Sequence, residues 1–139
     1  MTALIYLVTL AATTADTSIP DEIERPALEH EIMRRGALVA CIDVRDRSAP
    51  KQFLSGIKAP GHTVVALSDC VWSQDGVKSA TGEAAVNLSV DRWARKSSIE
   101  VHVTISWHRS SAESGEETLV LRQESGVWRV SQSLGERVV

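Results

Sequence analysis

Residues 99–133 constrain the fold most strongly, because apolar and polar side chains alternate there with a period of two. One side of the first run carries Ile99, Val101, Val103, Ile105 and Trp107. A polar loop at 110–116 and a short turn at 124–126 separate it from two further runs. Successive side chains of a strand point to opposite faces, so the pattern predicts a meander of three antiparallel strands with one apolar face. The rest of the chain must cover that face.

The earlier part of the chain supplies candidate covers and further strands. Residues 20–36 predict a helix with Leu28 and Ile32 on one stripe, and residues 50–57 predict a short second helix. Residues 37–45 alternate as a strand does, but Ala and Leu also favour a helix, and both alternatives stay open. Strands are expected over residues 63–73 and 84–93, with Asp75–Gly76 as a hairpin turn.

This order of elements predicts an α+β fold. We expect the N-terminal helix and the short second helix to pack on a curved antiparallel sheet of about five strands. A length of 139 residues and an apolar content of 43% fit a single domain, which we assign to residues 16–139. The net charge of −3 and the lack of a basic stripe argue against nucleic-acid binding.

Residues 1–15 are predicted to be a signal peptide. An apolar run from Ala3 to Ala12 is too short to span a bilayer, and Thr13 and Ala15 have the spacing of residues before a cleavage point. No Lys or Arg precedes the run, so a buried N-terminal strand is the alternative, and the protein would then be cytoplasmic. Nothing later in the chain is apolar enough for stable membrane insertion, so we expect a periplasmic or secreted protein.

Cys41 and Cys70 are the two cysteines of the chain. In an exported protein they predict one disulfide, and two buried thiols are the alternative. Neither has a second cysteine two residues away, so a zinc site is not expected. A nucleophilic role for Cys70 would need a base such as His62, and no local motif supports it.

The end of the chain resembles the closing hairpin of nuclear transport factor 2-like domains, which have a cystatin-like cone. The residues concerned are Leu119 to Leu121, Ser125–Gly126 and Trp128 to Val130, an apolar strand, a Gly-containing turn and a Trp-containing strand. The whole pattern also resembles small exported bacterial proteins of unknown function that share this Trp-containing ending. The resemblance implies a pocket between helix and sheet and commonly a homodimer. It carries over no catalytic residue. The steroid-isomerising members of the family use a Tyr and acidic residues in the pocket, whereas the one tyrosine here, Tyr6, lies in the predicted signal, and the Asp–Arg–Asp set of the epoxide-hydrolysing members has no clear counterpart.

The candidate chemistry is sparse. Asp43 and Asp69 lie in strand-like stretches, where burial could raise a carboxyl pKa and make a base. Glu100, His102 and His108 share one strand face, but the two histidines would be roughly 20 Å apart, too far to bind one metal ion. Asp91 is a third strand acid. We predict no metal and no cofactor.

Four tryptophans lie in predicted strands, and Trp72, Trp107 and Trp128 are candidates for binding a flat apolar ligand. Core packing of these indoles is the competing interpretation. The sequence therefore favours a non-catalytic, exported domain that binds a small apolar ligand or a protein partner. A small hydrolase- or isomerase-type enzyme with Asp43 or Asp69 as base is one alternative, and a structural accessory protein of the envelope is another.

Overall fold

The computed structural model describes residues 19–44 and 49–138, and the predicted signal at 1–15 lies outside them. Two helices, one 3-10 turn and eight strands follow in order. They are α1 Asp21–Arg35, β1 Val39–Val44, α2 Lys51–Ser55, β2 Thr63–Ala66, η1 Leu67–Asp69, β3 Cys70–Ser73, β4 Gly76–Ser79, β5 Ala85–Ser97, β6 Glu100–Ser110, β7 Glu113–Glu124 and β8 Val127–Val138. The α+β class is confirmed.

The predicted antiparallel sheet of about five strands is wrong. The main sheet is mixed and has six strands in the order β2-β1-β5-β6-β7-β8, and β3 and β4 form a separate hairpin. Strand β1 is parallel to both β2 and β5, whereas β5 to β8 are antiparallel. The connection through α2 returns the chain to the same end of the sheet, which makes β1 and β2 parallel. Residues 37–45 thus hold a strand, and five of its six residues are buried because both of its faces are covered.

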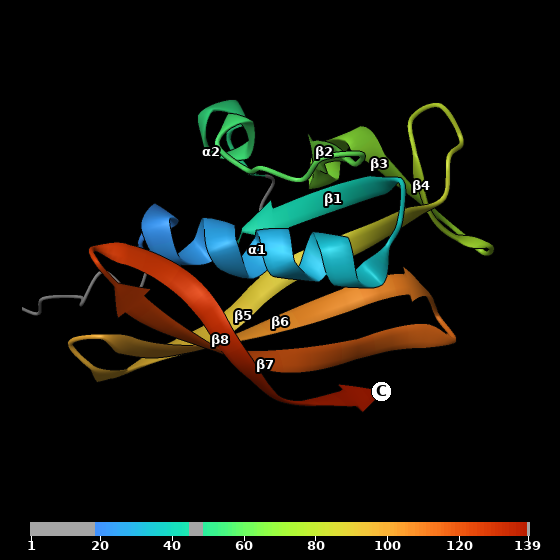
Figure 1. Ribbon diagram of the computed structural model, residues 1–139. Helices are drawn as coiled ribbons and strands as arrows, with labels where there is room; N and C mark the ends of the chain where they lie inside the picture. The colour runs from blue at the N-terminus through green and yellow to red at the C-terminus, as the bar shows by residue number, and fades with distance from the viewer. Residues whose placement is uncertain (1–18, 45–48, 139) are drawn as a thin grey trace, which may run out of the picture.

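Helix α1 lies in the hollow of the curved sheet, with β5 to β8 sweeping around it (Figure 1). Its buried face consists chiefly of Ile23, Ala27, Leu28 and Ile32, which recur at helical spacing. Burying an aliphatic side chain of this size contributes about 1.5–3 kcal/mol. Acidic residues in the first turn and basic residues in the last turn complement the helix dipole, and Gly36 ends the helix with a positive φ of 69°.

The predicted meander corresponds to β6, β7 and β8. Val101, Val103 and Ile105 are fully buried against α1, as the alternation predicted, but Ile99 precedes β6 and is 49% exposed. Ser125 and Gly126 both have positive φ in the turn between β7 and β8. The apolar face of this meander forms the floor of the main core.

The opposite face of the sheet carries a second, smaller core. Val39, Cys41, Val77 and Ala85 pack there beneath the β3–β4 hairpin, which turns at Asp75 as predicted. The expected single strand at 63–73 is divided by η1 into β2 and β3. The predicted disulfide is confirmed, and it joins Cys41 on β1 to Cys70 at the start of the hairpin.

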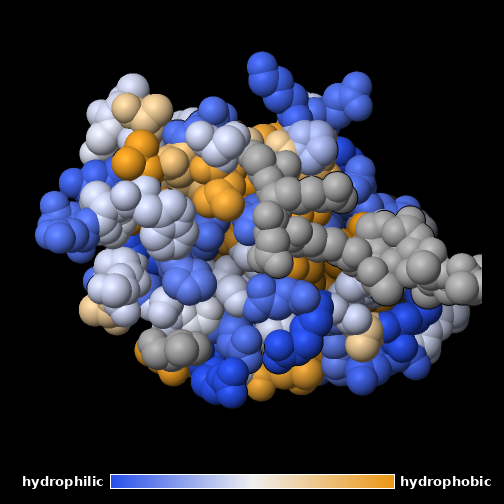
Figure 2. All heavy atoms as spheres, turned by 180° about the vertical axis from the view of Figure 1, so that it is seen from behind, coloured by the Kyte–Doolittle hydropathy of each residue, from blue (hydrophilic) through white to orange (hydrophobic). Residues whose placement is uncertain are grey.

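In the rear view, hydrophobic side chains are visible at the surface among polar ones (Figure 2). Within residues 19–44 and 49–138, no helix combines the length and the apolar character needed to cross a bilayer.

Candidate functional site

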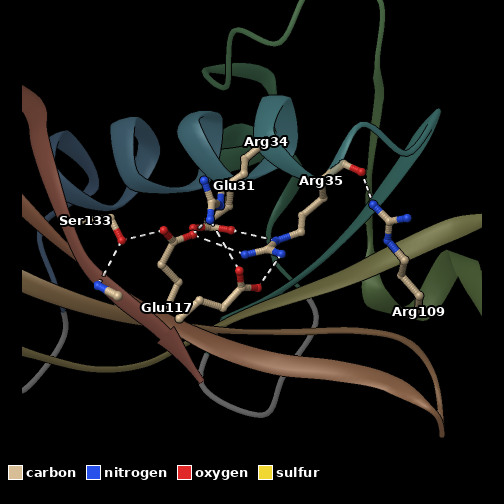
Figure 3. Close-up of polar contacts among 8 residues, drawn as sticks. Glu31, Arg34, Arg35, Arg109, Glu117 and Ser133 are labelled. Atoms are coloured by element: carbon tan, nitrogen blue, oxygen red, sulfur yellow. Dashed lines mark hydrogen bonds and ion pairs between the residues drawn. The ribbon is translucent and has the colours of Figure 1, made fainter. Parts of the chain in front are cut away.

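A cluster of charged side chains holds α1 to the sheet. It contains Glu31, Arg34 and Arg35 of α1, Glu117 of β7, and Ser133 and Glu136 of β8, and we call it the Glu31–Glu117 cluster. Its helical members project from α1 toward Glu117 and Ser133 (Figure 3). Both Glu31 and Glu117 are buried, at 0% and 1% exposure. A buried charge needs a partner, so the geometry of the arginines decides how this cluster is stabilised.

The two guanidinium groups bridge the three carboxyl groups. Arg35 Nε lies 3.0 Å from Glu31 Oε2, and its two Nη atoms lie 3.1 Å from Glu117 and 2.6 Å from Glu136. Arg34 Nε lies 2.9 Å from Glu117. With all groups ionised, three carboxylates would lie beside two guanidinium groups, which leaves a net charge of −1. One proton on a carboxyl group would balance the charge. We expect that proton on the carboxyl group with the fewest arginine contacts.

That group is Glu31. Burial, together with the adjacent Glu117 carboxylate, raises the pKa of Glu31 to about 8, and Arg35 only partly offsets this. Burial also opposes the charge of Glu117. However, hydrogen bonds from Glu31 and Ser133, together with Arg34 and Arg35, lower the Glu117 pKa below its usual value. The raised pKa of Glu31 favours its protonated form at neutral pH, with the ionised Glu117 carboxylate beside it.

The chemistry of the cluster suits helix anchoring better than catalysis or metal binding. His30, Glu31 and Glu117 bring possible ligand atoms within 4.8 Å of one another. The guanidinium groups already contact the oxygens that a cation would need, and burial shields the two acids from any substrate. Arg35 also stacks over Trp107, 4.3 Å from the ring centroid, and Arg109 donates a hydrogen bond to the Arg35 carbonyl.

An open groove runs along the outer side of this cluster, between α1 and the first half of β8. Successive turns of α1 line the groove with Pro26, Glu29, His30, Met33 and Arg34. Lys58 and Val127, Trp128, Arg129 and Val130 line the rest. Its volume is about 890 Å³. We call it the α1–β8 groove.

The groove combines apolar and cationic groups. Met33 is 52% exposed and Val127 is 50% exposed, above a floor that includes the buried Trp128. Lys58 and Arg129 are exposed on the rim, and neither makes an ion pair with a described residue. Glu29 is the one acid in the lining, and one of its oxygens accepts a hydrogen bond from the Lys58 backbone N–H at 2.9 Å. The rim therefore has an excess of positive charge.

The three candidate tryptophans do not share one cavity. Trp107 and Trp128 belong to the main core, where Trp128 also forms part of the groove floor. Trp72 lies in the β3–β4 hairpin on the far side of the sheet, 51% exposed, with its ring centroid 6.0 Å from that of His108. Only Trp128 thus lines the groove.

The candidate acids lie apart from the groove as well. Asp43 is buried near the end of β1, on the sheet face that carries Cys41. Asp69 is exposed at the end of η1 and lines a cavity between α2 and β2 with Lys51. His62 Nδ1 contacts the Ala37 carbonyl at 2.6 Å and so lies beside the start of β1. Asp43, Asp69 and His62 thus lie on three separate segments: β1, η1 and the residue before β2.

The outer face of β6 carries Glu100, His102 and His108. Glu100 lies between His102, at 3.2 Å, and Arg122, at 3.1 Å, and these two groups lower its pKa. His108 pairs with Asn87 at the other end of the β5–β6 ladder, whereas His102 pairs with Ala94. The two histidines are therefore separated along the strand, as the sequence spacing predicted.

Sequence reasoning missed the Glu31–Glu117 cluster, although a signal was present. Glu117 has the same strand parity as Leu119 and Leu121, which places an acid on the apolar face, opposite Ile105. An acid in such a position needs a cationic partner, and Arg34 and Arg35 at the end of α1 were the available ones.

A scan against protein-family models, a search of curated proteins and a search of solved structures each gave no match. The resemblance to nuclear transport factor 2-like domains therefore stays a prediction.

Proposed function

We propose that this protein is a non-catalytic binding domain that holds an acidic, partly apolar segment of a partner protein in the α1–β8 groove. One observation carries the proposal: exposed Met33 and Val127 lie beside Lys58 and Arg129, two cations without ion-pair partners in the described chain. Apolar surface rimmed by charge is typical of interaction sites. Complementary charge would add specificity and speed association.

A protein segment suits this groove better than a small enclosed ligand. The groove is open along its length, and deep pockets for small molecules bury most of the ligand surface. An extended segment needs only a strip of contact, with apolar side chains over Trp128 and Met33 and acids near Lys58 and Arg129. The buried, ion-paired state of the Glu31–Glu117 cluster supports a binding role over a catalytic one.

Fluorescence anisotropy with two labelled peptides tests the proposal. One peptide alternates Leu with Glu and the other alternates Leu with Lys, so they differ only in charge. We expect the Glu peptide to bind and its affinity to fall with added salt, because exposed charges are screened. Equal binding of the two peptides would contradict the proposal.

Charge reversal locates the site. Arg129→Glu and Lys58→Glu should each weaken binding of the Glu peptide by about fivefold or more. Two exposed cations outside the groove provide controls. Lys96→Glu matches the lysine, since Lys96 likewise makes no ion pair with a described residue, and Arg137→Glu on β8 removes a cation that is paired with Glu116 at 3.1 Å. If the control variants weaken binding as much as the groove variants, the peptide binds by general charge attraction and the proposed site is wrong.

We further propose that the protein acts outside the cytoplasm. The Cys41–Cys70 disulfide supports this, since structural disulfides persist in oxidising compartments. The signal peptide that we predict at residues 1–15 would direct the export. N-terminal sequencing of the mature protein should start near residue 16, and an intact Met1 would contradict export.

A further inference from the structure

We infer that the partner segment, whose binding rests on the proposed function, adds a strand to the outer edge of β8 at residues 127–130, which no described strand covers. The bound segment would be extended and would alternate apolar with acidic side chains. Its main chain would hydrogen-bond to β8, and its side chains would supply the specificity.

The lining of the groove shows that it follows the edge of β8 and not one of its faces. Val127, Trp128, Arg129 and Val130 all line it, although neighbouring side chains of a strand point to opposite faces. Side chains from both faces of a strand reach one groove where it runs beside the strand edge, and we take this arrangement for β8. Such a groove gives access to the main-chain N–H and C=O groups of that edge.

Strand β8 is the last strand of the main sheet, and β7 is its one partner in the described sheet. Its outer edge therefore offers main-chain groups that can pair with another chain. At the other margin of the sheet, β2 is only four residues long, and the groove does not reach it.

Two register shifts limit the usable length of the β8 edge. The pairing with β7 skips Ser131 and then Leu134, so β8 is bulged at both positions. Ser131 Oγ donates a hydrogen bond to the Val120 carbonyl at the first bulge. A bulge interrupts regular pairing, so the uninterrupted edge spans Val127 to Val130, directly after the turn at Gly126. We therefore expect a short recognition motif of about four to five residues.

The side chains of β8 set the phase of the motif. Trp128 and Val130 face the core and α1, whereas Val127 and Arg129 face the other way. An added strand would direct every second side chain toward Trp128, Val130 and Met33, and these should be apolar. The side chains between them would lie on the face of Val127 and Arg129, and the one over Arg129 should be acidic. Alternation of Leu and Glu meets both requirements in a single register phase.

N-methylation of the Leu–Glu peptide provides the test. The N–H groups of a strand point alternately to its two sides, so only one alternate set can face β8. Two peptides with equal numbers of N-methyl groups are compared, one methylated at the Leu nitrogens and the other at the Glu nitrogens. We expect one pattern to weaken binding at least tenfold and the other to change it less than twofold. The comparison uses the full chain at peptide concentrations that keep the peptide monomeric.

The outcomes separate this inference from the proposed function. If both patterns leave affinity unchanged while Arg129→Glu still weakens binding, the groove is the site and strand addition is wrong. If both weaken binding equally, pairing along one edge is also wrong. If the unmodified Glu peptide fails to bind, the proposed function itself is overturned. Amide hydrogen exchange gives an independent readout, because exchange within residues 127–130 should slow when the peptide is bound.

Discussion

Replacing Glu31 with Gln removes the one ionisable group whose proton balances the buried cluster. The amide has the shape of the protonated acid, so it can still donate to Glu117 and accept from Arg35. The variant should therefore fold like the wild type at pH 5. Its free energy of unfolding should differ from that of the wild type only where Glu31 would ionise.

The magnitude follows from the pKa of Glu31. In the unfolded chain the carboxyl group ionises near 4.5, and in the folded protein near 8. Between these values the folded state binds more protons, so the contribution of Glu31 is fully present below pH 4.5 and is lost as the pH rises through 8. At about 1.4 kcal/mol per pH unit, the wild type should lose about 4 kcal/mol between pH 5 and pH 8.5 through this group alone. The lowered pKa of Glu117 acts in the opposite sense, giving stability that is lost as the pH falls below 4.5.

Urea unfolding at pH 5, 7 and 8.5 measures the effect in wild type, Glu31→Gln and Glu22→Gln. Glu22 is an exposed acid on the same helix, so its replacement controls for the loss of one helical carboxylate. Other titrating groups cancel in the comparison with wild type. We expect the Glu31→Gln variant to gain about 4 kcal/mol relative to wild type between pH 5 and pH 8.5, and the control to stay parallel to wild type. Parallel profiles for wild type and Glu31→Gln would refute the protonated state of Glu31.

Two further predictions concern the cores. Replacing both Cys41 and Cys70 with Ala should lower the free energy of unfolding by about 3–4 kcal/mol, because the bridge closes a loop with a sequence separation of 29 residues. Urea unfolding of the oxidised wild type and of the variant measures this difference. Unchanged stability would contradict a structural bridge. Ile105→Ala should lower the free energy of unfolding by about 2–5 kcal/mol, because Ile105 is fully buried in the main core. Replacing the exposed Ile99 with Ala should change it by no more than about 0.5 kcal/mol. Similar changes for the two variants in urea unfolding would refute the assigned face of β6.

The meander was predictable because its signal is local. A strand with one buried face alternates in sequence, so residues 101–107 and the turn at Gly126 could be placed without a structure. Ile99 is not buried as the alternation predicted, because it lies in the turn before β6 and the pairing of β6 with β5 begins at Glu100. Alternation predicts the face of a residue only once it is in the strand.

The mixed sheet was not predictable in the same way. Strand β1 is buried on both faces, so the alternation within residues 37–45 does not mark one face as core and the other as solvent, and it does not reveal the neighbouring strands. The direction of β2 depends on how the chain crosses through α2, and a helix of five residues gives a weak signal. Short strands β2 and β3 also merge in sequence, since only η1 divides them.

The candidate site depends on contacts between distant parts of the chain. Arg34 and Glu136 are 102 residues apart, and Met33 and Val127 line the same groove because the sheet curls around α1. Trp128 was identified from sequence as a candidate, but its cationic neighbours Lys58 and Arg129 were not. The sequence pattern shows which side chains are apolar, whereas the curvature of the sheet decides which of them share a groove.

Nuclear magnetic resonance titration of the ¹⁵N-labelled protein with the Leu–Glu peptide tests the binding site most directly. Amide shifts should change along residues 27–34 of α1, at Lys58 and at residues 127–130 of β8, with little change in the β3–β4 hairpin. Changes centred on Trp72, or none at saturating peptide, would contradict the assignment of the α1–β8 groove.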